Sequence, residues 1–224
     1  MLNKLKPLFV LLFIASQGFA QSFDEDSIWV KELEEIVISG TRAGENTPVA
    51  YQNISKEEIE IRNLGQDMPY ILSASPSLVY TSDAGTGIGY TGMRIRGSDA
   101  TRINVTINGI PYNDSESQGT FWVDLPDFSS SVNSIQIQRG VGTSTNGSGA
   151  FGASVNLETN IHSKEAFAVL NNSFGSFRTR KHNFVLNSGL LGDKWSFEGK
   201  LSQIASEGYV DRATADLNSY FLSG

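Results

Sequence analysis

The chain has 224 residues, a formal net charge of −7 and no cysteine. This length allows one or two domains, and the lack of cysteine excludes disulfides and thiolate metal sites. An acidic chain lacks the basic face that phosphates require, so we expect no nucleic-acid partner. Only two histidines occur, His162 and His182, which excludes a multi-histidine metal centre within this chain and disfavours a Ser-His-Asp triad.

The first twenty residues resemble an export signal. Lys4 and Lys6 give a positive start, an apolar run follows over residues 8–15, and Gly18-Phe19-Ala20 is a small-x-small cleavage pattern. The apolar run is too short to span a bilayer. We therefore predict a secretory signal peptide at residues 1–20, with the mature chain starting at Gln21.

Residues 21–44 are predicted to be a flexible segment that contains one extended run. The run, Glu35-Ile36-Val37-Ile38-Ser39-Gly40, has three β-branched residues, and residues 41–48 are a linker by composition. A β-branched run on a flexible tether can add as a strand to the exposed sheet edge of another protein. The alternative is an ordinary edge strand of the domain that follows.

Residues 45–158 are predicted to form one compact α+β domain, a small mixed sheet with short helices. Ser55-Lys56-Glu57-Glu58 fits a capping box, which predicts a helix from Lys56 to about Gly65. Asp67 can cap a second helix that stops before Ser75-Pro76, and Asn108-Gly109 predicts a hairpin turn. Strands are predicted at residues 50–54, 78–81, 93–96, 103–107, 132–139 and 154–159.

Residues 159–224 have a different pattern, with long strands that alternate apolar and polar residues. Two runs, near 181–187 and 194–205, are joined by a short turn at 188–193, and less clear strands lie near 165–174 and 218–224. This alternation is typical of the first antiparallel strands of a transmembrane β-barrel, although a soluble sandwich looks the same locally. About four strands cannot close a barrel, so we expect the chain to be the N-terminal part of a longer protein.

Two other motifs carry less weight. Gly87-Ile88-Gly89-Tyr90-Thr91-Gly92 spells G-x-G-x-x-G, but a strand follows it, so no helix N-terminus is available for a pyrophosphate. The oxygen-rich stretch at residues 113–117 lacks the spacing of an EF-hand, and a solvated loop is the simpler interpretation.

Three sequence blocks taken together resemble the plug domain of TonB-dependent outer-membrane receptors. The blocks are Arg96-Gly97 followed by Asn108-Gly109-Ile110-Pro111, then Arg139-Gly140, then Ser148-Gly149-Ala150-Phe151-Gly152. The resemblance covers residues 34–158 well and continues less specifically to residue 224. The chain departs from the family pattern at Gly152-Ala153, where a second glycine is usual, and after Gly140, where a proline is common.

The resemblance implies TonB-dependent import of a scarce ligand across the outer membrane of a Gram-negative cell, with the plug gating the barrel. The expected partners are the TonB periplasmic domain, a small-molecule ligand and outer-membrane lipid; a siderophore-type metal chelate, heme or cobalamin is favoured. No cofactor and no enzymatic activity are expected. A secreted or surface β-rich binding module without transport is the alternative, and a periplasmic hydrolase is disfavoured.

The resemblance also implies three sets of site residues. The TonB box, which would bind TonB, corresponds to Glu35, Ile36, Val37, Ile38, Ser39 and Gly40. Arginines that would latch the plug to barrel carboxylates correspond to Arg96, Arg102 and Arg139, with a salt bridge within the plug as the alternative. Weaker candidates for ligand contact, near the plug apex, are Tyr80, Asp83, Tyr90 and Thr91.

Overall fold

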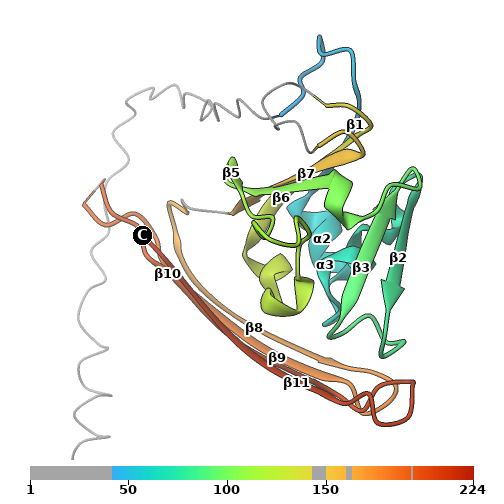
Figure 1. Cartoon of the computed structure of the whole chain (residues 1–224). Coiled ribbons are helices and arrows are strands. Elements are labelled where there is room, and N and C mark those ends of the chain that lie inside the picture. Colours follow the sequence, from blue (N-terminus) through green and yellow to red (C-terminus); the bar gives the residue numbers. More distant parts are fainter. Residues whose placement is uncertain (1–41, 143–149, 160–162, 193) are drawn as a thin grey trace, which may run out of the picture. The chain divides into compact units, whose positions relative to one another are not determined.

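The computed structural model describes residues 42–142, 150–159, 163–192 and 194–224. The predicted signal peptide and the run at residues 35–40 lie outside the described residues. The described chain forms three sheets (Figure 1): a five-stranded sheet of order β1-β6-β7-β4-β5, a two-stranded ribbon β2-β3, and a four-stranded sheet of order β11-β10-β9-β8.

The first two sheets and the helices form a mixed-sheet domain, residues 42–159. In the five-stranded sheet β4 pairs with β7 in parallel, whereas all its other pairs are antiparallel. The strands are β1 (Ala50–Ser55), β2 (Leu78–Ser82), β3 (Thr91–Ile95), β4 (Ile103–Ile107), β5 (Ile110–Pro111), β6 (Val132–Arg139) and β7 (Ala153–Thr159). The helical elements are α2 (Lys56–Arg62), α3 (Met68–Ile71), η2 (Leu72–Ala74), η3 (Ala100–Arg102), η4 (Trp122–Asp124) and η5 (Phe128–Ser131). The predicted α+β class is confirmed, with boundaries within two residues for most strands.

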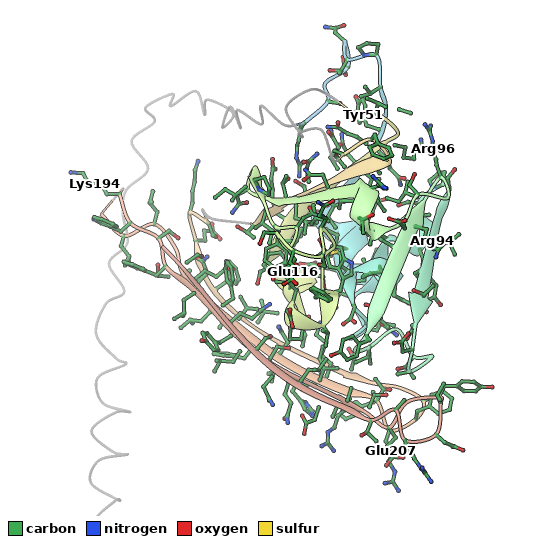
Figure 2. All side chains as sticks on the ribbon, viewed as in Figure 1. Tyr51, Arg94, Arg96, Glu116, Lys194 and Glu207 are labelled. Carbon is green, nitrogen blue, oxygen red and sulfur yellow. The ribbon has the colours of Figure 1, made fainter. Side chains whose placement is uncertain are left out.

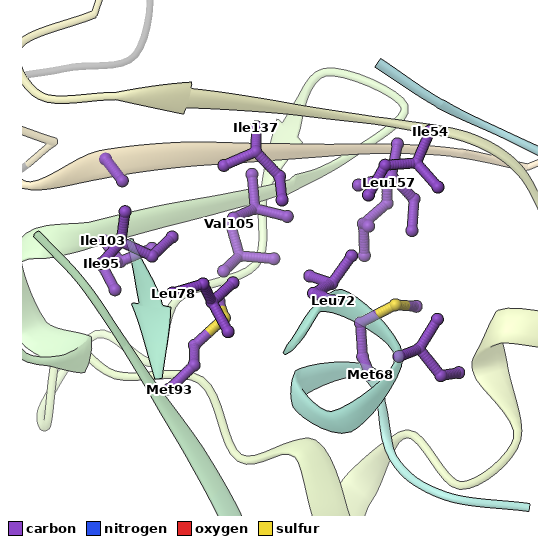
Figure 3. Packing of buried hydrophobic residues seen from close by; sticks show 14 of the residues in the cluster. Ile54, Met68, Leu72, Leu78, Met93, Ile95, Ile103, Val105, Ile137 and Leu157 are labelled. Atoms are coloured by element: carbon purple, nitrogen blue, oxygen red, sulfur yellow. The ribbon is translucent and has the colours of Figure 1, made fainter. Parts of the chain in front are cut away.

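One hydrophobic core holds this domain together, because each element turns its apolar side toward the same space. Met68 and Leu72 from the helical segment pack under Ile54, Ile137 and Leu157 of the five-stranded sheet (Figure 3). The ribbon β2-β3 closes the side of the core. Its buried contributors are Leu78, Met93 and Ile95. Burying side chains of this size stabilises a fold by roughly 1.5–3 kcal/mol each.

Local sequence signals explain where the two α-helices begin. The predicted capping box is present: Ser55 Oγ accepts from the Glu58 N–H, and Glu58 Oε2 accepts from the Ser55 N–H. Asp67 does precede α3, but the prediction that its side chain caps this helix is wrong. The carboxylate is instead buried and accepts a hydrogen bond from the Thr91 hydroxyl at 2.9 Å, because the end of β3 packs over it.

The four strands β8 (Ala166–Phe174), β9 (Arg180–Ser188), β10 (Glu198–Ser206) and β11 (Ala215–Ser223) are each nine residues long. Each pairs antiparallel with its sequence neighbour. Nine to eleven residues suffice for a tilted transmembrane strand. These strands resemble the start of a barrel, as predicted.

The two faces of this sheet have opposite chemistry. The buried face is mainly polar on β9 and β10, with Lys181, Asn183 and Lys200 almost fully covered beside the apolar Val185 and Ile204. The exposed face is apolar: Leu201 is 63% exposed, and Phe184 and Tyr220 also lie open. Such a polar-in, apolar-out arrangement is the reverse of a soluble protein and is typical of strands that face lipid.

The β9–β10 connection (residues 189–197) and the β10–β11 connection (residues 207–214) are similar in length, so the first is longer than the short turn predicted at 188–193. Lys194 lies in the β9–β10 connection and Glu207 in the β10–β11 connection, at opposite ends of the sheet (Figure 2). In the latter loop Gly208 has a positive φ of 77°, and an added Cβ there would collide with the Ala213 carbonyl oxygen. Among the residues that the structure describes, no helix has the length and apolar character needed to cross a membrane.

Candidate functional site

The most densely bonded polar group of the described chain is Asp127, which precedes η5. Its backbone is left-handed, with φ 52° and ψ 24°, a conformation that Asp and Asn tolerate better than most residues. The side chain lies between the mixed-sheet domain and β9, in contact with residues of both. Asp127 is only 2% exposed, so its charge has to be compensated by protein groups.

The compensation comes from the polar face of the four-stranded sheet. Lys181 Nζ lies 2.7 Å from Asp127 Oδ1, and Asn183 Nδ2 donates to Asp127 Oδ2 at 2.6 Å. Lys200 Nζ donates to the Asp127 carbonyl oxygen at 2.6 Å. Residues from two neighbouring strands therefore converge on one carboxylate-bearing turn.

The mixed-sheet domain completes the shell around these charges. Ser130 Oγ donates to Asp127 Oδ1 at 2.6 Å, and Asn63 Nδ2 approaches the same oxygen at 3.3 Å. Lys181 Nζ also donates to Ser130 Oγ at 3.2 Å. We call these residues the Asp127 cluster: Asn63, Asp127, Ser130, Lys181, Asn183 and Lys200.

The electrostatics of the cluster keep Asp127 ionised. Burial acts to raise the pKa of Asp127, but the charges of Lys181 and Lys200 and the hydrogen bonds outweigh it, so the pKa lies below its ordinary value. A paired, hydrogen-bonded charge of this kind is costly to break, because either partner left alone would be an uncompensated buried ion. The Asp127 cluster therefore joins the mixed-sheet domain to the four-stranded sheet through noncovalent bonds that are costly to break.

A second contact joins the glycine loop between β2 and β3 to the loop that follows β10. The N–H of Tyr209 donates to the Ala84 carbonyl at 2.8 Å, and an added Cβ on Gly85 would lie 3.0 Å from the Tyr209 Cβ. Phe177, in the β8–β9 loop, packs edge-on against Tyr209 with ring centroids 5.5 Å apart. Aromatic rings therefore line the region beside the glycine loop, which we call the apical loop (residues 83–90).

The family model described as TonB-dependent Receptor Plug Domain matches residues 43–154, half of the chain. The chain belongs to this family. The mixed-sheet domain is therefore a plug domain. The sheet β8–β11, which contacts it through the Asp127 cluster, resembles the start of a barrel. No curated protein matches the chain.

Solved structures share this fold at low sequence identity. FpvA of P. aeruginosa, solved with heterologous pyoverdines, is 14% identical with a TM-score of 0.63, covering 79% of this chain and 23% of its own. The siderophore receptor PirA of Acinetobacter baumannii is 22% identical with a TM-score of 0.54, covering 70% and 24%. The ferric-catecholate import receptor Fiu of E. coli K12 is 16% identical with a TM-score of 0.56, covering 71% and 22%. The chain thus spans about a quarter of the length of these structures.

The four predicted ligand-contact residues lie together at the apical end of the β2-β3 ribbon. Tyr90 and Asp83 are exposed and joined by a backbone hydrogen bond of 3.0 Å, and Tyr80 is partly exposed and packs edge-on against Tyr70. The Thr91 hydroxyl is engaged with buried Asp67. Contact of these residues with a ligand stays a prediction.

The three predicted latch arginines lie at one end of the plug. Arg96 has a positive φ of 51°, and its Nη1 lies close to Gly140, next to Arg139. Arg102 stacks over the Phe151 ring at 4.9 Å. Within the described ranges none of the three forms an ion pair with β8–β11, so their pairing with barrel carboxylates stays a prediction. Figure 2 shows Arg94 and Arg96 projecting from the plug surface.

Sequence reasoning did not single out Asp127, Tyr209 or Phe177 as site residues. The alternation of β9 and β10 did place Lys181 and Lys200 on the polar side, and two lysines on the inner face of a strand pair signal a missing anion. Which carboxylate supplies it depends on the left-handed turn at Asp127, which nothing local in the sequence specifies. The loop at residues 113–117 behaves as predicted: Asp114 Oδ1 accepts from the N–H of Glu116 and of Ser117, which is a self-contained solvated turn.

Proposed function

We propose that this chain is the plug end of a TonB-dependent importer of siderophore-type metal chelates in the outer membrane of a Gram-negative bacterium. The observation that carries the proposal is the sheet β8–β11, which exposes apolar residues and binds Asp127 of the plug on its buried face: Lys181 pairs with the carboxylate and Lys200 donates to the main-chain carbonyl. Such a sheet needs lipid on its exposed apolar face and a plug on its polar face. The names of the structurally similar proteins, which include siderophore and ferric-catecholate receptors, support the ligand class.

In this function the ligand binds beside the apical loop, where Tyr80, Tyr90, Tyr209 and Phe177 offer aromatic surface. Rings of this kind suit flat chelates such as catecholates, because an aromatic face stacks with little loss of entropy. Binding changes the population of a state in which residues 35–40 are available to TonB, which is a coupling free energy between two sites. Heme and cobalamin, which offer a macrocycle for stacking, are alternative ligands, and a competition series distinguishes them from ferric siderophores.

The TonB box is tested by removing its capacity to pair as a strand. Ile36→Pro and Val37→Pro each remove one backbone donor, so we expect uptake of a radioiron-loaded siderophore to be lost while surface binding of the same chelate is retained. Glu25→Pro, upstream in the same predicted flexible segment, is the matched control and should import normally. Normal uptake by both box variants would show that residues 35–40 do not bind TonB.

Extraction separates the proposal from the alternative of a secreted module. A chain with lipid-facing strands should partition with outer membranes and need detergent for release. Release by salt or buffer alone would instead indicate a soluble binding module.

A further inference from the structure

Arg42 and Ala43, the first described residues after the 35–40 segment, are bound to the centre of the plug sheet. Arg42 Nε lies 2.9 Å from Glu158 Oε1 on β7. Its Nη2 donates to the Ser134 carbonyl of β6 at 3.0 Å and to the Asn156 carbonyl of β7 at 3.1 Å. One guanidinium thus joins two neighbouring central strands.

Ala43 is held by a pair of hydrogen bonds to one amide. The Ala43 N–H donates to Gln136 Oε1 at 2.6 Å, and Gln136 Nε2 donates to the Ala43 carbonyl at 2.9 Å. The same amide also bonds Asn53 Oδ1 at 2.8 Å and accepts from Gln138 Nε2 at 2.9 Å. With all its donors and acceptors occupied and its side chain buried, Gln136 is fixed in place.

We call these contacts the clasp; its residues are Arg42, Ala43, Gln136 and Glu158. The clasp lies on the opposite face of the sheet from the hydrophobic core. On β6 the residues Ile135 and Ile137 face the core, so Gln136 between them faces the other way. The face is polar yet covered. A buried, satisfied polar network contributes position and rigidity more than net stability.

The chain path makes the clasp mechanically important. After Ala43 the chain turns through residues 44–49 and enters β1, which is the edge strand and pairs only with β6. Without the clasp, a pull on the N-terminal segment would reach Ala50 first and peel β1 from β6 one bond at a time. With the clasp, the pull meets several bonds to β6 and β7 at once.

We propose that the clasp transmits mechanical force from the N-terminal segment to the plug sheet. When residues 35–40 are pulled, the contacts of the clasp are the first in the sheet to resist the force. This inference rests on the proposed function, because TonB would supply the pull. Ala43 and Gln136 act as positioning residues. They transfer the pulling force to the central strands β6 and β7, so that the edge strand β1 is not peeled from β6. Loss of the clasp would change which part of the plug opens first.

The test uses proline at two neighbouring positions. Ala43→Pro removes the donor to Gln136 and leaves every side chain of the sheet intact. Glu45→Pro is the matched control, because Glu45 is the second residue of the Gly44–Thr47 turn (Thr47 N–H to Gly44 carbonyl, 2.9 Å), where proline is favoured. Since the chain has no cysteine, a single cysteine introduced at Gln21 can carry a pulling handle on the receptor in supported bilayers.

At constant force, we expect the first unfolding event of Ala43→Pro to occur about tenfold sooner than in the parent, the effect of leaving one buried hydrogen-bond partner unmatched. Glu45→Pro should match the parent. Arg42→Gln should also shorten the time to the first unfolding event. Its matched control, Arg94→Gln at an exposed plug arginine, should behave as the parent does. Unchanged lifetimes for both clasp variants would overturn the proposal.

A second handle separates load bearing from simple stability. When the pull is applied through a cysteine at Glu116, on the exposed loop that follows β5, the clasp variants and the parent should have equal lifetimes. An equal shortening from both handles would mean that the variants only destabilise the plug, and would overturn the proposal. Because no TonB is used, the outcome is independent of the TonB-box variants. If those variants import normally, residues 35–40 do not bind TonB, whereas the pulling result still decides the clasp.

Discussion

In both the plug sheet and the sheet β8–β11, apolar and polar residues alternate along the strands. The plug sheet turns its apolar residues toward the core, whereas the sheet β8–β11 buries mainly polar residues and exposes its apolar ones. In β6 and β7 the apolar residues Ile135, Ile137 and Leu157 face a packed core. In β9 and β10 most residues that face inward are polar, with Val185 and Ile204 as the apolar exceptions, and Leu201 and its apolar neighbours face outward. The period-two pattern fixes which residues share a face, and the medium on each side decides which face is buried. The plug sheet faces an apolar core, whereas the sheet β8–β11 faces the polar groups of the plug and exposes its apolar side chains.

The largest expected effect comes from breaking the polar contact between the two regions. Asp127→Asn keeps the left-handed turn but leaves Lys181 without its counter-charge, which costs roughly 3–5 kcal/mol for a buried ion pair. We expect a marked fall in the thermal stability of the detergent-purified receptor and faster proteolysis of the plug. Removing both charges with Asp127→Asn and Lys181→Met should recover much of the loss. If the single variant were as stable as the parent, the cluster would not hold the plug.

Matched truncations in the two sheets sharpen the comparison. Ile137→Ala opens a cavity in the packed plug core and should cost about 3 kcal/mol. Leu201→Ala removes a similar side chain from the exposed face of β10, where lipid or detergent fills the gap, so we expect a cost below about 1 kcal/mol. Unfolding midpoints in the same detergent measure both. Equal costs would indicate that the outer face of β10 is covered by protein.

A pH-dependent effect concerns Asp67, under the apical loop. Burial raises the pKa of Asp67 to about 7, partly offset by the hydrogen bond from Thr91. The folded plug therefore holds a proton that the unfolded chain has released above about pH 4, so stability falls as the pH rises toward 7 and is level above it. Between pH 5 and 7 the fall should be about 2 kcal/mol.

Asp67→Asn should remove this slope, and Asp83→Asn, at an exposed carboxyl of the same loop, should keep it. Hydrogen exchange of the apical-loop amides against pH measures the effect locally. If the exchange rates of the parent protein changed between pH 5 and 7 only as intrinsic amide exchange does, Asp67 would be ionised in the folded plug.

Much of the plug fold followed from local signals. The capping box at Ser55 and Glu58 placed α2, the Asn108-Gly109 pair placed a turn with two positive φ angles, and alternation placed β4 and β6. The motif blocks indicated the family, which the match to residues 43–154 shows. These features depend on residues close together in the chain, so a short window of sequence contains the whole physical cause.

By itself the sequence determined most strands, the position of α2, the alternation of the strands and the family, but not the short helical turns η3, η4 and η5. Only the tertiary structure decided that Asp127 meets Lys181 and Lys200, that Asp67 is buried under Thr91 rather than capping α3, and that Ala43 is held by Gln136. Asp127 is separated from Lys181 and Lys200 by 54 and 73 residues, Asp67 from Thr91 by 24, and Ala43 from Gln136 by 93. Such a polar group is placed by packing and by the cost of leaving a buried charge or amide unpaired, and that cost arises only once distant strands have come together.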